Sequence, residues 1–282
     1  MTESRDNKTK KKKRTAGDVI RVIALLIAIG VFVYSGYRLL TIYLEYKAGT
    51  DEYSSLEDFA NISGNPSGGS DSDPDGAGVK VETNEQGETE RYMESPVDFA
   101  GLKAINKDVI GWLNVEALDI SYPMVRGTDN DYYLHRTFKK EDNFAGSIFM
   151  DYLNNPNLKD QNTIIYGHNM KNGSMFGTLK QFREEGVFEK SRYFWIYTPT
   201  MNYKYEIFSC HEVGAVSNTY QISFAKDKEF QDYLDEAVEH SVVKGTAKAT
   251  SKDRIVTLST CTGNEATRFV VQGVLVDSIK VK

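Results

Sequence analysis

Apolar residues are unevenly distributed along the chain and divide it into three parts of different texture. Residues 19–40 form a nearly continuous apolar run, and the part from Val22 to Tyr37 carries no charged residue. Residues 61–90 contain six Gly, two Pro and no aromatic residue. From about Ser95 onward, short apolar runs alternate with turn-forming residues, which is typical of a folded domain rich in β-strands.

The first apolar run predicts a membrane-spanning helix, a signal-anchor over residues 19–44. Arg21 and Arg38 flank its uncharged part. Their long side chains can reach the lipid headgroups, which extends the span to about 20 residues, the length needed to cross the hydrocarbon. A cleaved signal peptide is the alternative, but no Ala-x-Ala cleavage site follows the run.

Charge is distributed as unevenly as hydrophobicity. The net charge is −6, but residues 1–44 carry nine basic and three acidic residues, and residues 45–100 carry three basic and fourteen acidic ones. The basic cluster from Lys8 to Arg14 precedes the apolar run, so the positive-inside rule places residues 1–18 in the cytoplasm and the following domain outside the cell. A basic nucleic-acid-binding domain is excluded, because this cluster is the only basic run.

The acidic stretch rich in Gly and Ser predicts a flexible extracellular spacer over residues 45–94. A segment of this composition cannot bury enough apolar surface to offset the entropy lost on ordering. The folded domain is therefore expected over residues 95–282.

Strand and helix patterns in this domain predict a mostly β fold. Eight runs rich in β-branched and aromatic residues are expected to be strands, at residues 110–115, 119–125, 146–150, 162–167, 193–198, 203–213, 254–261 and 268–281. Apolar residues recur with helical spacing over residues 226–243, and a shorter helix is expected over 97–106. Eight strands favour an eight-stranded β-barrel with peripheral helices.

Reactive side chains are few, because the chain contains two cysteines and four histidines. Two cysteines exclude a disulfide scaffold and a four-cysteine zinc site. No phosphate-binding GxGxxG or GxxxxGK[ST] loop is present, and we expect neither a metal nor a cofactor. Cys210 and His211 are neighbours on a predicted strand, so their side chains point to opposite faces and cannot form a reactive pair. Cys210 is expected to be a small buried apolar residue.

Cys261 and His168 differ from the other candidates because each ends an apolar strand and precedes turn-forming residues. Arg268 opens the next predicted strand, and a hairpin would place it across from Cys261. A guanidinium there can favour a thiolate and stabilise an oxyanion. The alternative is a disulfide between Cys210 and Cys261, in a membrane-tethered binding module without catalytic activity.

Three stretches of the chain resemble one enzyme family. TLSTC, at residues 257–261, followed by an Arg that opens the next strand, resembles the active-site signature of sortases, the cysteine transpeptidases of Gram-positive bacteria. YGHNM, at residues 166–170, resembles the histidine segment of the family. GSIFMDYLNN, at residues 146–155, and the long helix before the cysteine strand resemble class B members. The similarity covers roughly residues 95–282, and the anchor and spacer fit the family's usual layout.

The resemblance implies a function and a set of site residues. It implies cleavage of a sorting signal in secreted proteins after a Thr, a thioacyl intermediate, and transfer to an amine of the peptidoglycan precursor at the outer face of the cell membrane. Polymerisation of pilins is the alternative role within the family. The implied catalytic residues are Cys261 as nucleophile, His168 as acid and base, and Arg268 as oxyanion or substrate-positioning group; the expected substrate-binding residues are Tyr166, Ser259 and Thr260.

Two features depart from the family pattern. Some class B members have an acidic residue directly after the cysteine, whereas this chain has Thr262, which argues against a carboxylate orienting the catalytic pair there. The loop to Arg268 is short, and this bears on which sorting motif is recognised. A cysteine L,D-transpeptidase is disfavoured, because Leu-Ser-Thr precedes Cys261 where that family has an SxGC context.

Overall fold

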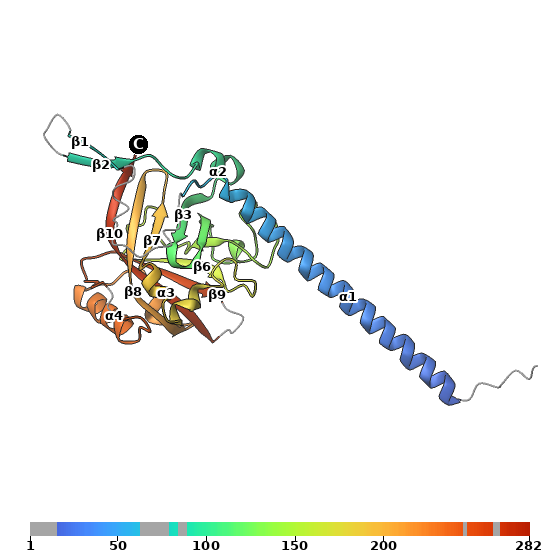
Figure 1. The fold of residues 1–282 in the computed structure, drawn as a ribbon. Helices are drawn as coiled ribbons and strands as arrows, with labels where there is room; N and C mark the ends of the chain where they lie inside the picture. Colours follow the sequence, from blue (N-terminus) through green and yellow to red (C-terminus); the bar gives the residue numbers. More distant parts are fainter. Residues whose placement is uncertain (1–15, 63–78, 84–88, 245–246, 262–265) are drawn as a thin grey trace, which may run out of the picture. The chain divides into compact units, whose positions relative to one another are not determined.

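The computed structural model describes residues 16–62, 79–83, 89–244, 247–261 and 266–282. The chain divides into two compact units, Met1–Lys47 and Ala48–Lys282. The first unit contains most of one long helix, and the second contains the strands (Figure 1).

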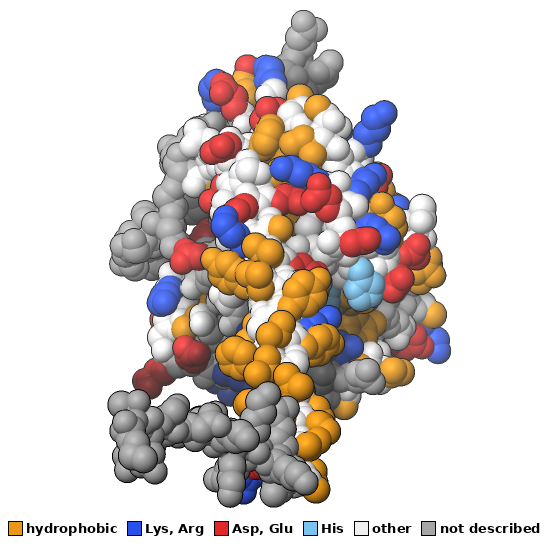
Figure 2. Space-filling model, turned by 90° about the vertical axis from the view of Figure 1, so that its right-hand side faces the viewer, with side chains coloured by type: hydrophobic (Ala, Val, Ile, Leu, Met, Phe, Trp, Pro, Cys, Tyr) orange, Lys and Arg blue, Asp and Glu red, His pale blue; other side chains and the backbone are white. Residues whose placement is uncertain are grey.

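Helix α1 spans Ala16–Glu57 and carries the apolar run. An 18-residue window within it has a mean hydropathy of 2.3 and no buried residue, so the helix is long and apolar enough to cross a membrane. A signal sequence near the N-terminus can satisfy the same criteria of length and hydropathy. Most of the exposed large hydrophobic residues belong to α1, and Figure 2 shows hydrophobic side chains gathered in a strip.

The end of α1 is part of the folded domain rather than of a spacer. Leu56 is fully buried and Tyr53 is 6% exposed, and the Tyr53 hydroxyl donates a hydrogen bond to the Gly146 carbonyl at 2.7 Å. The sequence pattern suggested a flexible spacer from residue 45, but residues 48–57 are helical and packed within the second unit. Tyr53 and Leu56 are three residues apart and share one helix face, a short stripe that the surrounding acids obscure in the sequence.

We expect Leu56→Ala to destabilise the domain by about 2–5 kcal/mol, because it removes a fully buried side chain and leaves a cavity. Leu153→Ala is the matched control, since Leu153 is 65% exposed and its truncation should change stability by less than about 0.5 kcal/mol. Urea denaturation of the two variants measures the difference. Equal midpoints would show that the end of α1 is not part of the cooperative unit.

Eight strands form a closed barrel within the described part of the chain, which confirms the predicted fold class. Neighbouring strands follow the order β10-β8-β7-β3-β4-β5-β6-β9, and the barrel closes because β9 also pairs with β10. The pairs β4–β5 and β6–β9 are parallel and the other barrel pairs are antiparallel. The strands are β3 (Val109–Val115), β4 (Ile120–Val125), β5 (Ile148–Met150), β6 (Asn162–His168), β7 (Tyr193–Tyr197), β8 (Met201–Gly214), β9 (Ile255–Cys261) and β10 (Thr267–Val281).

A hairpin adds two strands that the sequence pattern did not predict. Strands β1 (Lys80–Thr83) and β2 (Thr89–Met93) pair antiparallel, and β2 runs parallel to the end of β10, with Tyr92 opposite Lys280. All four residues of β1 are exposed. A strand without a buried face leaves no alternation of apolar and polar residues in the sequence.

Short helices connect the strands. Helix α2 begins after Asp98, whose side chain accepts a hydrogen bond from the backbone N–H of Gly101 at 2.9 Å and so caps the helix. The helices after α1 are α2 (Phe99–Ile105), η2 (Glu116–Leu118), η3 (Tyr132–Leu134), η4 (Leu179–Arg183), α3 (Val187–Lys190), η5 (Asn218–Tyr220) and α4 (Asp227–Glu239).

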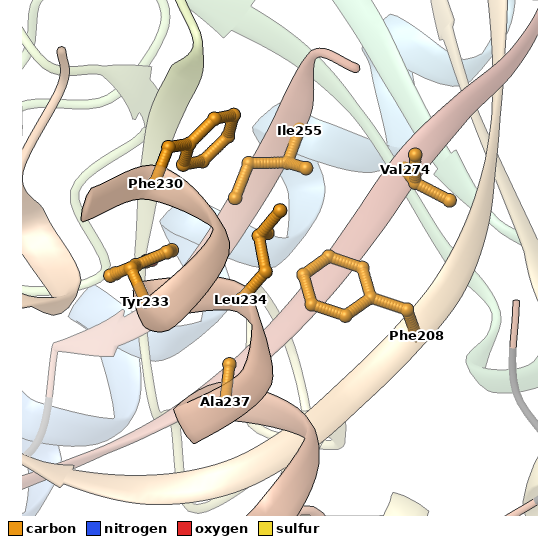
Figure 3. Close-up of a cluster of buried hydrophobic side chains, with 7 residues drawn as sticks. All are labelled: Phe208, Phe230, Tyr233, Leu234, Ala237, Ile255 and Val274. Atoms are coloured by element: carbon orange, nitrogen blue, oxygen red, sulfur yellow. The ribbon is translucent and has the colours of Figure 1, made fainter. Parts of the chain in front are cut away.

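Helix α4 packs its apolar stripe on three barrel strands. Figure 3 shows the cluster, in which four side chains of α4 meet side chains of β8, β9 and β10. Val238 lies at the edge of the stripe and is 42% exposed. The helix therefore fixes the relative positions of the strands that carry Cys261 and Arg268. The cluster consists of Phe208, Phe230, Tyr233, Leu234, Ala237, Ile255 and Val274.

Candidate active site

Strands β6 and β9 are parallel neighbours, and their register joins the two strongest candidates. Gly167 is opposite Thr260, and His168 is opposite Cys261. Neighbouring strands in a sheet lie about 4.8 Å apart. More than ninety positions of sequence therefore separate two residues whose backbones are adjacent at the same end of the barrel.

Strand β10 brings Arg268 to the same end. Ser259 is opposite Val270 in the antiparallel β9–β10 pair. The Phe269 N–H donates a hydrogen bond to Thr260 Oγ1 at 3.0 Å. One further step along the same register reaches Cys261 on β9 and Arg268 on β10. His168, Cys261 and Arg268 thus lie on three neighbouring strands of the barrel, and β9 and β10 pair antiparallel, as the hairpin hypothesis expected.

The imidazole of His168 is held by a backbone carbonyl. Its Nε2 lies 2.7 Å from the carbonyl oxygen of Leu134. A carbonyl can only accept, so Nε2 carries the proton, and in the neutral ring Nδ1 is the nitrogen without one. Burial lowers the pKa of His168 below its usual value, and this effect exceeds that of the Leu134 hydrogen bond, which raises it.

Two glycines allow the close packing around this histidine. Gly146 has a φ of +57°, and a Cβ there would lie 2.5 Å from the same Leu134 carbonyl oxygen. A Cβ on Gly167 would lie 2.5 Å from Cδ1 of Ile148. A larger residue at either position would displace the backbone that carries or holds His168.

An aromatic pair lies beside the histidine strand. Tyr166 and Tyr220 stack with ring centroids 6.1 Å apart and an interplanar angle of 28°. The Tyr220 hydroxyl is 3.0 Å from Ser259 Oγ, and the Tyr166 hydroxyl donates to Asp151 Oδ2 at 3.0 Å. Tyr166 and Ser259, two of the expected substrate-binding residues, therefore belong to one connected group with Tyr220. Tyr220 was missed, because its loop has no repeating pattern that could reveal its position in the sequence.

The structure does not bring Thr260 to this group. Its side chain is 2% exposed, and its hydroxyl donates to the Phe269 carbonyl and accepts from the Phe269 N–H. Successive residues of a strand face opposite sides, so Thr260 faces away from the side that Ser259 occupies. Its hydroxyl links β9 to β10 instead.

Cys210 is a free, buried thiol, which contradicts the alternative of a disulfide with Cys261. Burial raises the pKa of the Cys210 thiol above its usual range, so it stays protonated and unreactive. Among the described residues no group of three or more His, Cys, Asp or Glu side chains could hold a metal ion.

Comparisons with known proteins agree on one family. A family model described as Sortase domain matches residues 113–276. Sortase B of Listeria monocytogenes is 35% identical over 254 residues, which cover 89% of this chain and 94% of that protein. Sortase B of Staphylococcus aureus is 34% identical over 175 residues, covering 61% of this chain and 72% of that protein.

Solved structures show the same likeness. A crystal structure of sortase B from B. anthracis has a TM-score of 0.65 at 33% identity, covering 84% of this chain and all of that one. A Staphylococcus aureus sortase B–substrate complex has a TM-score of 0.61 at 32% identity, covering 64% of this chain and 84% of the other.

Proposed function

This chain belongs to the sortase family of cysteine transpeptidases, in class B, and we propose that Cys261, His168 and Arg268 perform its chemistry. The proposed reaction cleaves a sorting peptide after a Thr, forms a thioacyl enzyme and transfers the acyl group to an amine of the peptidoglycan precursor. The register of β6 and β9, with His168 opposite Cys261, is the observation that carries the proposal.

Acylation begins with attack of the Cys261 thiolate on the Thr carbonyl carbon. A carbon–sulfur bond forms and the carbonyl π electrons move to oxygen, which gives a tetrahedral oxyanion. The oxyanion collapses, the peptide C–N bond breaks, and the leaving amine takes a proton from His168 as imidazolium. The Leu134 carbonyl fixes Nε2–H, so Nδ1 is the nitrogen that exchanges the proton.

Deacylation reverses these roles. The acceptor amine attacks the thioester carbonyl and gives its excess proton to the neutral imidazole, and the thiolate of Cys261 leaves. Proton transfer back and forth through one nitrogen requires a fixed ring, which the Leu134 hydrogen bond supplies.

Arg268 is proposed to stabilise the oxyanion in both steps. We expect Arg268→Ala to lower kcat/KM by about 10²–10³-fold, the usual effect of removing one oxyanion donor. Arg268→Lys should recover only part of the loss, because an ammonium keeps the charge but not the planar fork of donors. The steady-state rate with a quenched sorting peptide measures both.

Arg192→Ala is the matched control for Arg268. Arg192 directly precedes β7, its side chain is 47% exposed, and it pairs with Glu206 on β8. The variant should leave kcat/KM unchanged. Equal losses in Arg192→Ala and Arg268→Ala would contradict the role of Arg268.

Tyr166 and Ser259 are the residues we propose to contact the sorting peptide, together with Tyr220. They form one hydrogen-bonded and stacked group beside His168. Thr260 is left out, because its hydroxyl is occupied by the backbone of β10. The solved Staphylococcus aureus sortase B–substrate complex supports a peptide partner for this fold.

Membrane attachment through α1 is proposed with the N-terminus in the cytoplasm. The apolar window of α1 and the basic residues that precede it support this orientation. The barrel would then lie outside the cell membrane, where secreted proteins meet cell-wall precursors.

The proposal is tested with the full chain, because Tyr53 and Leu56 pack in the domain and a piece that begins at residue 95 would lose them. The chain is incubated with quenched sorting peptides, with and without an amine acceptor. Mass spectrometry should find cleavage after Thr and an acyl adduct on Cys261. Cleavage with no adduct on Cys261, or an adduct elsewhere, would contradict the mechanism.

A further inference from the structure

A cavity of about 170 Å³ lies between α4, the end of β8 and the loop around Ser217. It lies on the sheet face that carries Arg268. Arg268 is opposite Val213 on β8 and Val270 is opposite His211, and alternate residues of a strand share a face. Val213 and His211 both line the cavity.

Gln272 contributes a buried acceptor without a donor. Its Nε2 donates to the Tyr233 hydroxyl at 2.6 Å and to Thr257 Oγ1 at 3.1 Å. These two oxygens give their own protons to the Thr219 carbonyl and to Asn162 Oδ1, so only the amide nitrogen of Gln272 can face them.

The amide oxygen of Gln272, Oε1, has no hydrogen-bond partner among the described residues, although Gln272 is fully buried. Gln272 lines the cavity. A buried polar atom of this kind requires an explanation, and a ligand donor is one.

His211 offers a second acceptor to the cavity. Ser209 donates its hydroxyl proton to the Ala237 carbonyl, so it accepts from Nδ1–H of His211 at 2.8 Å. The Nε2 of His211 is therefore the nitrogen without a proton. Burial lowers the pKa of His211 to about 4, so the ring is neutral at neutral pH.

Charge in the cavity is negative. Glu212 and Glu236 line it, and none of its described lining residues is Lys or Arg. Arg183 Nη2 pairs with Glu212 at 2.6 Å, whereas Glu236 accepts a hydrogen bond from the Asn218 amide at 3.3 Å. Glu212 lies between His211 and Val213 on β8, so its carboxylate faces the other side of the sheet, where it meets Arg183. The Glu236 carboxylate, a neutral imidazole nitrogen and an amide oxygen together are a set of acceptors. A primary ammonium has three donors and no acceptor and matches this set.

We propose that this cavity binds an ammonium group of the peptide that accepts the acyl group, an inference that rests on the proposed transpeptidation. The stacked Tyr166 and Tyr220 lie by Ser259, toward β6, whereas the described lining of the cavity comes from the end of β8, from β10, from α4 and from residues 217–219. Strand β8 is two strand spacings from β9, about 10 Å. Because β8 lies this far from the strand that carries Cys261, the proposed acceptor carries two amines, one that binds in the cavity and one that attacks the thioester.

The test compares two acceptor peptides, Gly-Gly-Lys amide and Gly-Gly-norleucine amide, which differ in one ammonium group. Binding to the full-length Cys261→Ala variant is measured by calorimetry, so no catalysis is needed. The Lys peptide should bind more tightly by up to about fivefold, the effect of one partly exposed ion pair. Glu236→Gln should remove most of the difference.

Glu239→Gln is the matched control, because Glu239 is exposed on the same helix and does not line the cavity. Gln272→Leu is a second variant, and it should also remove the difference in affinity between the two peptides. A thermal melting curve checks that this variant folds. Equal binding of the two peptides, or an equal effect of Glu239→Gln and Glu236→Gln, would overturn the assignment.

Two further outcomes separate this inference from the reaction itself. If Cys261→Ala prefers the Lys peptide but the unmodified chain forms no thioacyl adduct with sorting peptides, the cavity assignment is supported and the proposed function is rejected. The other outcome is that the two acceptor peptides bind equally, while a Lys in the sorting peptide lowers the KM for that peptide. This outcome overturns the assignment, because the cavity would then bind an ammonium of the sorting peptide and not of the acceptor.

Discussion

Replacing Cys261 with alanine is expected to abolish the thioacyl adduct and to lower the cleavage rate by on the order of 10⁴-fold or more. The nucleophile forms the bond that defines the intermediate, so no neighbouring group can replace it, and only substrate binding and oxyanion stabilisation remain. Intact-protein mass spectrometry after incubation with a sorting peptide measures the adduct, and the quenched peptide measures the rate.

Cys210→Ala is the control for this experiment, because Cys210 is the other cysteine of the chain. It is fully buried and its thiol pKa is raised, so the variant should keep the adduct and most of the cleavage rate while losing some stability to the small cavity. An adduct on Cys261→Ala, or its loss in Cys210→Ala at a temperature where that variant is folded, would reject Cys261 as the nucleophile.

The barrel could be predicted from the sequence because its strands are locally distinct. Each of the eight predicted strands overlaps an observed one. β9, for example, is a nearly continuous run of Val, Ile, Leu and Thr, and such a run marks a strand buried by packing on a helix. The barrel fold also follows from the number of strands, since closure leaves no exposed edge.

The meeting of His168 and Cys261 could be expected only in part. Both residues end a strand and precede a turn, which marks them as candidates, but nothing in the residues themselves sets β6 beside β9. That pairing is parallel and joins segments more than ninety positions apart. No short turn joins two parallel neighbouring strands, so their pairing depends on the order of all the strands in the sheet.

The backbone contacts of the site could not be predicted at all. The carbonyl of Leu134 holds His168, and any residue has a carbonyl, so the type of residue 134 gives no signal. Residue type was also misleading for Thr260. Its hydroxyl suggested a substrate contact, but its position in the strand directs the side chain to the backbone of β10. Strand alternation would have distinguished Ser259 from Thr260.

His168→Ala is expected to lower kcat/KM by about 10²–10⁴-fold, the usual contribution of a positioned general acid and base. Substrate binding should change little, so the loss falls on kcat rather than KM. His135→Ala is the control, since His135 is next to the residue that holds His168 but its side chain is 60% exposed. A loss in KM alone would show that His168 positions the peptide and transfers no proton.

The pH dependence of His168 follows from its burial. The pKa of His168 is lowered by desolvation, so in Cys261→Ala, where no thiol interacts with the ring, NMR should show it titrating below pH 6.5. The folded state then disfavours the charged ring, so this residue's contribution to stability is complete above about pH 6.5 and is lost as the pH falls through the lower folded value. A ring that titrates above pH 6.5 would show that hydrogen bonding outweighs burial.

A lowered pKa also limits the reactive form. Burial lowers the pKa of His168, so it favours the neutral ring over the imidazolium that acylation requires. The neutral ring is the form that deacylation requires, because it takes the proton of the acceptor amine. Burial of His168 therefore favours the second half of the reaction, and a stage-resolved experiment should find acylation, rather than transfer to the amine, slowing as the pH rises above 7.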